Sequence, residues 1–139
     1  MNVQARNVQI SEGAQISSST RGSGPGGTVQ VTATEALTIA GRSGNGSSGL
    51  FSTSEADGRG GDIHVQARHL TLSDGGSIAT NSTGTGNAGT IQLQVQEQFL
   101  STNSTVTTAA ERSGGGDIVI QAGPPFVEPP KFTNWESRP

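Results

Sequence analysis

The side chains that could perform acid–base or metal chemistry are few and widely spaced in this sequence. Asp62 and Asp117 each follow a Gly-Gly pair and precede a β-branched residue. Two facing carboxylates are the machinery of glycoside hydrolysis, with an inverting pair about 6.5–9.5 Å apart. Thr90 stands at the matching place between them, however, which breaks the pattern. A calcium ion held by these two carboxylates stays an open alternative.

The two histidines and the remaining acidic residues give no clearer site. His64 lies between Ile63 and Val65, where strand alternation turns its side chain toward solvent. Glu12 and Asp74 share a turn position in two repeats, with no lysine nearby. We therefore predict no catalytic, metal-binding or cofactor-binding residue and no enzymatic activity.

Two stretches match the pattern G-x-G-x-x-G, at 44–49 and 84–89. A dinucleotide site requires this motif between a strand and a helix. The second stretch runs directly into the strand-like residues 90–95, and the first belongs to a Gly/Ser-rich insertion. We interpret both as turn glycines.

Composition limits the classes of protein that the chain can represent. Of 139 residues, 29% are hydrophobic, 4% are aromatic and 21 residues are glycine. Such a chain is either disordered or arranged so that a thin core serves many residues. The net charge of −3 without a basic stripe argues against nucleic acid. No apolar run is long enough to span a membrane, the first residues do not read as a signal peptide, and cysteine is absent.

A repeated phrase organises the chain. A β-branched residue lies two positions after a glycine at Val29, Ile63, Ile91 and Ile118. Successive members of this series are 34, 28 and 27 residues apart. The stretch from Val3 matches the stretch from Val65 without a gap. These matches predict about four repeat units over 1–122, at approximately 1–27, 28–61, 62–89 and 90–116, with a fifth beginning at 117–122. The proline-rich segment 123–139 is expected to be a tail or linker.

Each unit shows three short alternating runs, so we predict an all-β chain with three short strands per unit. Units of this kind are expected to coil, so that each strand pairs in parallel with its equivalent in the previous unit. Equivalent aliphatic side chains then stack in three core ladders. The predicted ladders are Val3, Val31, Val65, Leu93 and Ile120; Ile10, Ile39 and Leu72, extended to Leu100; and Ile16, Leu50, Ile78 and Val106.

Two further features follow from the same alignment. Ser18, Ser52, Thr80 and Thr108 lie two residues past the third ladder, where alternation turns hydroxyls inward toward backbone carbonyls. The insertion from Gly41 to Gly49 leaves the repeat. If a partner touches this segment, we expect contact at Arg42, Ser43, Asn45, Ser47 and Ser48, and secondarily at outward Gln, Arg and His positions beside the first strand.

The repeat resembles those of filamentous haemagglutinin-like adhesins, exported by two-partner secretion in Gram-negative bacteria including cyanobacteria. The phrase at Gly58–Ile78, the stretch Thr83–Gly89 and the matches at 3–16, 28–39 and 116–122 carry the resemblance. It implies a right-handed parallel β-helix, a place on the bacterial cell surface, and a chain that is a segment of a longer protein.

From this resemblance we expect a secreted structural segment that acts as a stiff scaffold. Its expected partners are neighbouring β-helix turns of the parent chain, a surface glycan or protein, and other copies stacked end to end. Two alternatives remain open on the sequence alone. One is a fragment of a polysaccharide-active β-helix enzyme, and the other is a Thr/Ser-rich β-solenoid that binds ice or glycans.

Overall fold

The computed structural model describes residues 1–22, 24, 26–44, 46–55, 57–122 and 131–136. These residues form strands, turns and loops without a helix, so the prediction of an all-β chain is confirmed. The described part of the chain accordingly contains no apolar helix long enough to cross a membrane.

Five strands form a first parallel sheet in the order β1-β3-β7-β9-β11. Apart from β11, these are long strands, because two of the predicted runs in each unit are continuous. Every neighbouring pair is parallel, as the alignment of the units predicts. The strands are β1 (Asn2–Ser11), β3 (Val29–Ala40), β7 (Ile63–Ser73), β9 (Ile91–Thr102) and β11 (Ile118–Ala122).

Five shorter strands form a second parallel sheet in the order β2-β6-β8-β10-β12. They are β2 (Gln15–Thr20), β6 (Gly49–Ser54), β8 (Ser77–Ser82), β10 (Thr105–Ala110) and β12 (Lys131–Glu136). Strand β12 lies within the segment expected to be a tail or linker, and it pairs in parallel with β10. That expectation is therefore wrong for 131–136, because no proline lies within this strand and its six residues are able to pair.

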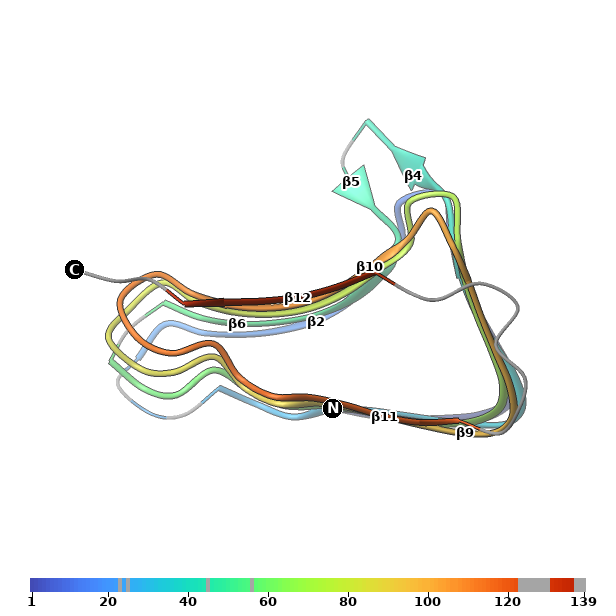
Figure 1. Cartoon of the computed structure of the whole chain (residues 1–139), viewed down its shortest axis with the longest axis horizontal. Coiled ribbons are helices and arrows are strands. Elements are labelled where there is room, and N and C mark those ends of the chain that lie inside the picture. The colour runs from blue at the N-terminus through green and yellow to red at the C-terminus, as the bar shows by residue number, and fades with distance from the viewer. Residues whose placement is uncertain (23, 25, 45, 56, 123–130, 137–139) are drawn as a thin grey trace.

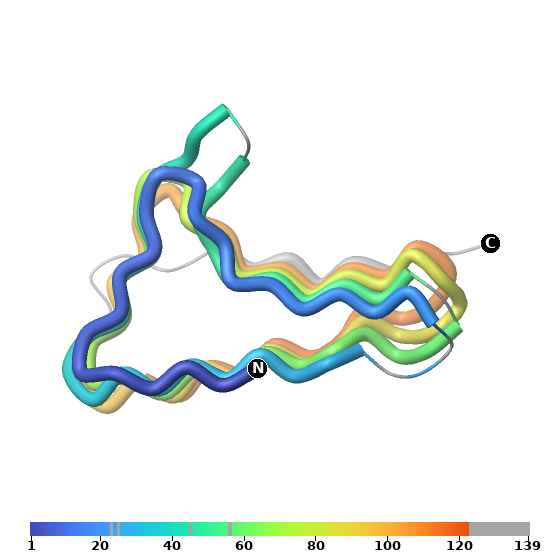
Figure 2. Tube along the Cα trace, turned by 180° about the vertical axis from the view of Figure 1, so that it is seen from behind, coloured from blue at the N-terminus to red at the C-terminus, as the bar shows by residue number. Residues whose placement is uncertain are grey.

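Successive units lie over one another, and their traces nearly superimpose when viewed along the stack (Figure 1). The same superposition is seen from behind (Figure 2). The buried aliphatic residues of both sheets form one cluster, so the core lies between the sheets. Each unit needs to add only a few aliphatic side chains to this shared core. A low apolar content is therefore sufficient to form it.

The register confirms the first and third predicted ladders in full. Val3 pairs with Val31, Val31 with Val65, Val65 with Leu93, and Leu93 with Ile120. In the second sheet, Ile16 pairs with Leu50, Leu50 with Ile78, and Ile78 with Val106. The members in the middle of each ladder are buried, whereas Val3, Ile16 and Ile120 near the ends are half-buried.

The second ladder continues differently from the prediction. Ile10 pairs with Ile39 and Ile39 with Leu72, as expected, but the residue opposite Leu72 is Ser101. Leu100 lies opposite Thr71, outside the ladder, and the buried aromatic Phe99 lies opposite Leu70. The assignment of Leu100 is therefore wrong.

Local irregularities in the long strands explain this shift. Between β7 and β9 the pairing passes from Ala67↔Val95 to His69↔Gln98, so β9 contains one more residue at this point than β7. Similar register shifts occur between β1 and β3 and between β3 and β7. The long strands bend sharply along their length in Figure 1. The prediction of three separate strands per unit is thus corrected to one long irregular strand and one short strand.

Glycines at one corner allow the units to approach closely. A Cβ on Gly61 would lie 1.9 Å from the carbonyl oxygen of Gly27, and a Cβ on Gly89 would lie 2.0 Å from that of Gly61. Gly116 continues the series, with a Cβ position 1.8 Å from the Gly89 oxygen. We call these four residues the glycine column. At Gly61, Gly89 and Gly116 only glycine fits, because any side chain there would overlap backbone.

The predicted inward hydroxyls lie beside the glycine column and bond to it. Ser52 donates to the carbonyl of Gly27 at 3.2 Å, and Thr80 donates to that of Gly89 at 3.1 Å. Thr108 donates to the carbonyl of Gly116 at 2.9 Å. All three of these residues are buried, which confirms the expectation for Ser52, Thr80 and Thr108, whereas Ser18 is half-buried.

Candidate functional site

The insertion predicted to contact a partner forms a small hairpin that projects from one corner (Figures 1 and 2). Strands β4 (Arg42–Ser43) and β5 (Gly46–Ser47) pair antiparallel, with Arg42 opposite Ser47 and Ser43 opposite Gly46. Arg42 and Ser43 are exposed and Ser47 is half-buried. Asn45 lies outside the described residues.

Ser48 does not belong with these surface residues. Its side chain is fully buried, and its hydroxyl accepts a hydrogen bond of 2.8 Å from the backbone N–H of Gly13. Ser48 therefore anchors the hairpin to the turn of the preceding unit. Its assignment as a contact residue is corrected, because it lies where the hairpin rejoins the regular strand β6.

Turns from the units before and after the hairpin continue the surface beside it. In β-turns 11–14 and 73–76, the last N–H donates to the first carbonyl, at 3.0 and 2.9 Å. Glu12, Gly13, Asp74 and Gly75 all have positive φ, as type I′ turns require. A depression of about 290 Å³ lies here, lined by Arg42, Ser47, Asp74, Gly75, Ser77, Asn103, Ser104 and Thr105.

A second candidate surface covers the outer side of the first sheet. Residues at alternate positions of β3, β7, β9 and β11 point away from the core there, and most of them carry side-chain amides. We define the amide face as Gln30, His64, Gln66, Gln92, Gln94 and Gln121. These residues are among the outward Gln and His positions that the sequence predicts as secondary contacts with a partner.

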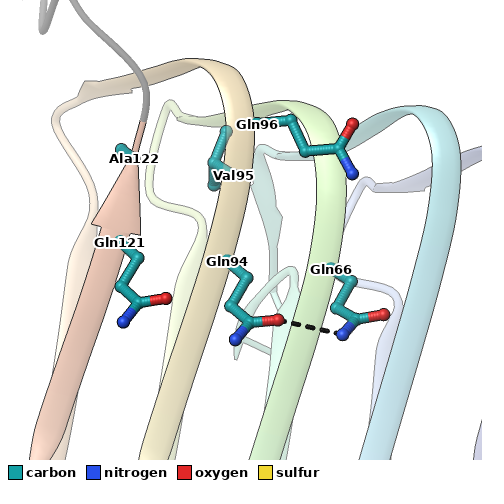
Figure 3. A pocket seen from close by; sticks show the side chains of 6 residues that line it. All are labelled: Gln66, Gln94, Val95, Gln96, Gln121 and Ala122. Atoms are coloured by element: carbon teal, nitrogen blue, oxygen red, sulfur yellow. Dashed lines mark hydrogen bonds between the residues drawn. The ribbon is translucent and has the colours of Figure 1, made fainter.

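The members of the amide face stack in two columns. Gln30, His64 and Gln92 occupy one column, and Gln66, Gln94 and Gln121 occupy the other. The Gln66 amide donates to the Gln94 carbonyl oxygen at 2.9 Å, and His64 Nδ1 lies 3.1 Å from the Gln92 carbonyl oxygen. Figure 3 shows the amides of Gln66, Gln94 and Gln121 projecting to the same side of their strands. Register thus creates a row of amides that no single unit contains.

Adjoining depressions follow these columns. One of about 350 Å³ is lined by Gln66, Gln94, Gln96 and Gln121, together with Val95 and Ala122 (Figure 3). A second of about 330 Å³ is lined by Gln30, His64, Val65, Gln66, Gln92 and Gln94. Because the two share Gln66 and Gln94, they form a continuous polar surface across several strands.

Charged residues flank the amide face and neutralise one another. The bulged regions of successive long strands carry Arg6, Glu35, Arg68 and Glu97, so the sign of the charge alternates along the stack. Arg68 lies 3.7 Å from Glu35 and 3.4 Å from Glu97. His69 Nε2 is 3.2 Å from Glu97. These pairs are solvent-exposed and contribute little to stability, but they favour the observed order of units.

Asp62 and Asp117 stand at equivalent places on two units, with Thr90 on the unit between them. Asp62 is engaged by Arg59 at 2.9 Å and accepts a hydrogen bond of 2.8 Å from the Thr90 N–H. Asp117 is exposed on a later unit. Within the described ranges, no three His, Cys, Asp or Glu side chains gather closely enough to hold a metal ion. Asp62 acts structurally here, tying two units together.

Comparisons with family models, with curated proteins and with solved structures gave no match to this chain.

Proposed function

We propose that this chain is a segment of a right-handed parallel β-helix that acts as a stiff scaffold in a secreted, filamentous haemagglutinin-like surface adhesin. The observation that carries the proposal is the unbroken in-register stacking of Val3, Val31, Val65, Leu93 and Ile120. Stacking of this kind extends by adding units, as in other repeat proteins whose neighbours share interfaces.

Three features make such a stack stiff. Backbone hydrogen bonds join every neighbouring pair of long strands. The glycine column sets a close spacing that a bend would have to open. Buried hydroxyls hold the corner carbonyls, and no buried side-chain nitrogen or oxygen among the described residues lacks a hydrogen-bond partner. A rod with these properties holds binding surfaces away from a cell.

In this role, the neighbouring turns of a longer parent chain are the segment's main partners. Equivalent strands would continue the ladders beyond β1 and β11, giving each unit a covered face on both sides. Isolated copies would stack end to end through the same strand edges. The projecting β4–β5 hairpin and the amide face are the surfaces left for other molecules.

Two measurements test the proposal. Far-ultraviolet circular dichroism of the chain is expected to give a β spectrum with a cooperative thermal transition, whereas a disordered spectrum at every concentration would refute the scaffold. Protease treatment of intact cells of the source organism is expected to release peptides from this segment, with a cytoplasmic protein as the protected control. Release of these peptides only after cell lysis would refute the surface location.

A further inference from the structure

The amide face has the chemistry of a surface that recognises hydroxyl groups. A glutamine side chain offers two N–H donors and a carbonyl acceptor, so it pairs with a sugar hydroxyl in either direction. Gln66 is exposed and Gln94 half-buried, and both line the two depressions of about 350 and 330 Å³. Their mutual hydrogen bond orients both amides before any ligand arrives.

The spacing of the columns indicates a repeating ligand. Parallel strands lie about 4.7–4.9 Å apart, so each column presents one polar side chain at that interval. Gln66, Gln94 and Gln121 come from β7, β9 and β11 in register. In an extended β-1,4-linked glucan, each sugar advances the chain by nearly one strand spacing. Successive sugars would therefore meet equivalent amides.

The uncharged lining of this surface favours a neutral polymer over an anionic one. Gln66, Gln94, Gln96 and Gln121 carry no charge, and they supply the polar lining of the depression of about 350 Å³. The guanidinium of Arg68 borders a further depression of about 280 Å³, and it lies within ion-pair distance of Glu35 and Glu97. Among the described residues, no lysine or arginine that would attract an anionic polymer lines the depressions of about 350 and 330 Å³, whereas a neutral glycan forms hydrogen bonds there without desolvating a charge.

We propose that the amide face binds a neutral, extended β-linked glycan, which lies along the stack across β3, β7, β9 and β11. This inference deepens the proposed function, on which it rests, by naming the ligand of one scaffold surface. The hairpin corner is left out of this site, because its depression lies among turns rather than along the strand columns.

Binding of cello-oligosaccharides to the whole chain, measured by titration calorimetry, tests the proposal. Affinity is expected to rise from cellobiose to cellotetraose and then to level off as the columns are filled. The double substitution Gln66→Ala/Gln94→Ala is expected to weaken cellotetraose binding about tenfold, as follows from losing two ordinary hydrogen bonds. Gln66→Thr/Gln94→Thr provides a second variant with strong β propensity, because Thr32 already occupies this column on β3.

The control is the double substitution Gln9→Ala/Gln98→Ala, which removes one glutamine from each of the long strands β1 and β9, outside the depressions that define the site. It is expected to leave affinity unchanged. Equal affinity of the Gln66/Gln94 variants and the unsubstituted chain would overturn the inference, as would binding of polygalacturonate but not cellohexaose. A chain that melts cooperatively yet binds no glucan overturns this inference alone. A chain without a cooperative transition overturns the scaffold as well.

Discussion

Gly89 lies in the middle of the glycine column, where the backbones of two units are in contact. A Cβ at this position would lie 2.0 Å from the Gly61 carbonyl oxygen and 2.5 Å from its carbonyl carbon. The Gly60 carbonyl oxygen would be 2.8 Å away. All three neighbours are backbone atoms, so no side-chain rotation relieves the overlap. Gly89→Ala must therefore move one unit away from the next.

This movement would lower the stability of the fold, because it weakens hydrogen bonds between the two units. The carbonyl of Gly89 accepts the hydrogen bond of buried Thr80, and backbone bonds on either side hold the same spacing. Introducing a methyl group into close-packed structure typically costs about 1–3 kcal/mol, and rigid backbone contacts place Gly89→Ala near the upper end. For a chain of this size, about 3 kcal/mol lowers the melting temperature by about 10 °C.

Thermal melting followed by circular dichroism measures this effect, and Gly22→Ala is the matched control. A Cβ on Gly22 would meet no heavy atom within 4 Å, so this substitution is expected to change stability by less than about 0.5 kcal/mol. If Gly89→Ala melts as cooperatively as the unsubstituted chain and within about 2 °C of it, the steric reasoning is refuted.

Two further predictions concern the corner hydroxyls and the hairpin. Thr80→Val keeps the shape of a fully buried side chain but removes its 3.1 Å hydrogen bond to Gly89, so the free energy of unfolding should fall by about 1–3 kcal/mol in urea titration. Thr53→Val, on half-buried Thr53 of β6, should change it by less than about 0.5 kcal/mol, and equal losses would contradict a role for the bond. Replacing residues 41–48 with Asp-Gly-Gly, the sequence of 74–76, should preserve a cooperative melt at a cost of about 1 kcal/mol, chiefly the Ser48 hydrogen bond to Gly13. The same replacement should leave cellotetraose affinity unchanged, and a lost melting transition would show that the hairpin is needed to hold its unit.

Much of the strand register was predictable because the sequence repeats its alternation. Val31, Val65 and Leu93 each lie four residues past a glycine and two residues past a β-branched residue. Their pairing confirms the alignment. The inward turn of Thr80 followed from the same alternation. Gln66 and Gln94 were recognisable as outward residues, but their hydrogen bond required the backbones of two units to be placed at strand spacing.

The second ladder was harder to predict, because an insertion in a strand is cancelled by a shorter turn after it. Strand β9 contains one extra residue in its bulged region, and the turn after it is one residue shorter than the turn after β7. Val106 therefore returns to register with Ile78, which conceals the shift at Ser101. Strand β12 was missed for a different reason. Prolines dominate the segment before it, and a local pattern gives no sign that β10 offers an open edge.

By itself, the sequence determined which residues face inward, because strand alternation and repeated glycines are local properties of the chain. It also determined the parallel pairing of successive units, because equal spacing brings equivalent residues together. Only the tertiary structure decided where bulges absorb extra residues, which glycines touch backbone, and which glutamines form a row. Those outcomes depend on distances between units, which the order of residues along one unit does not specify.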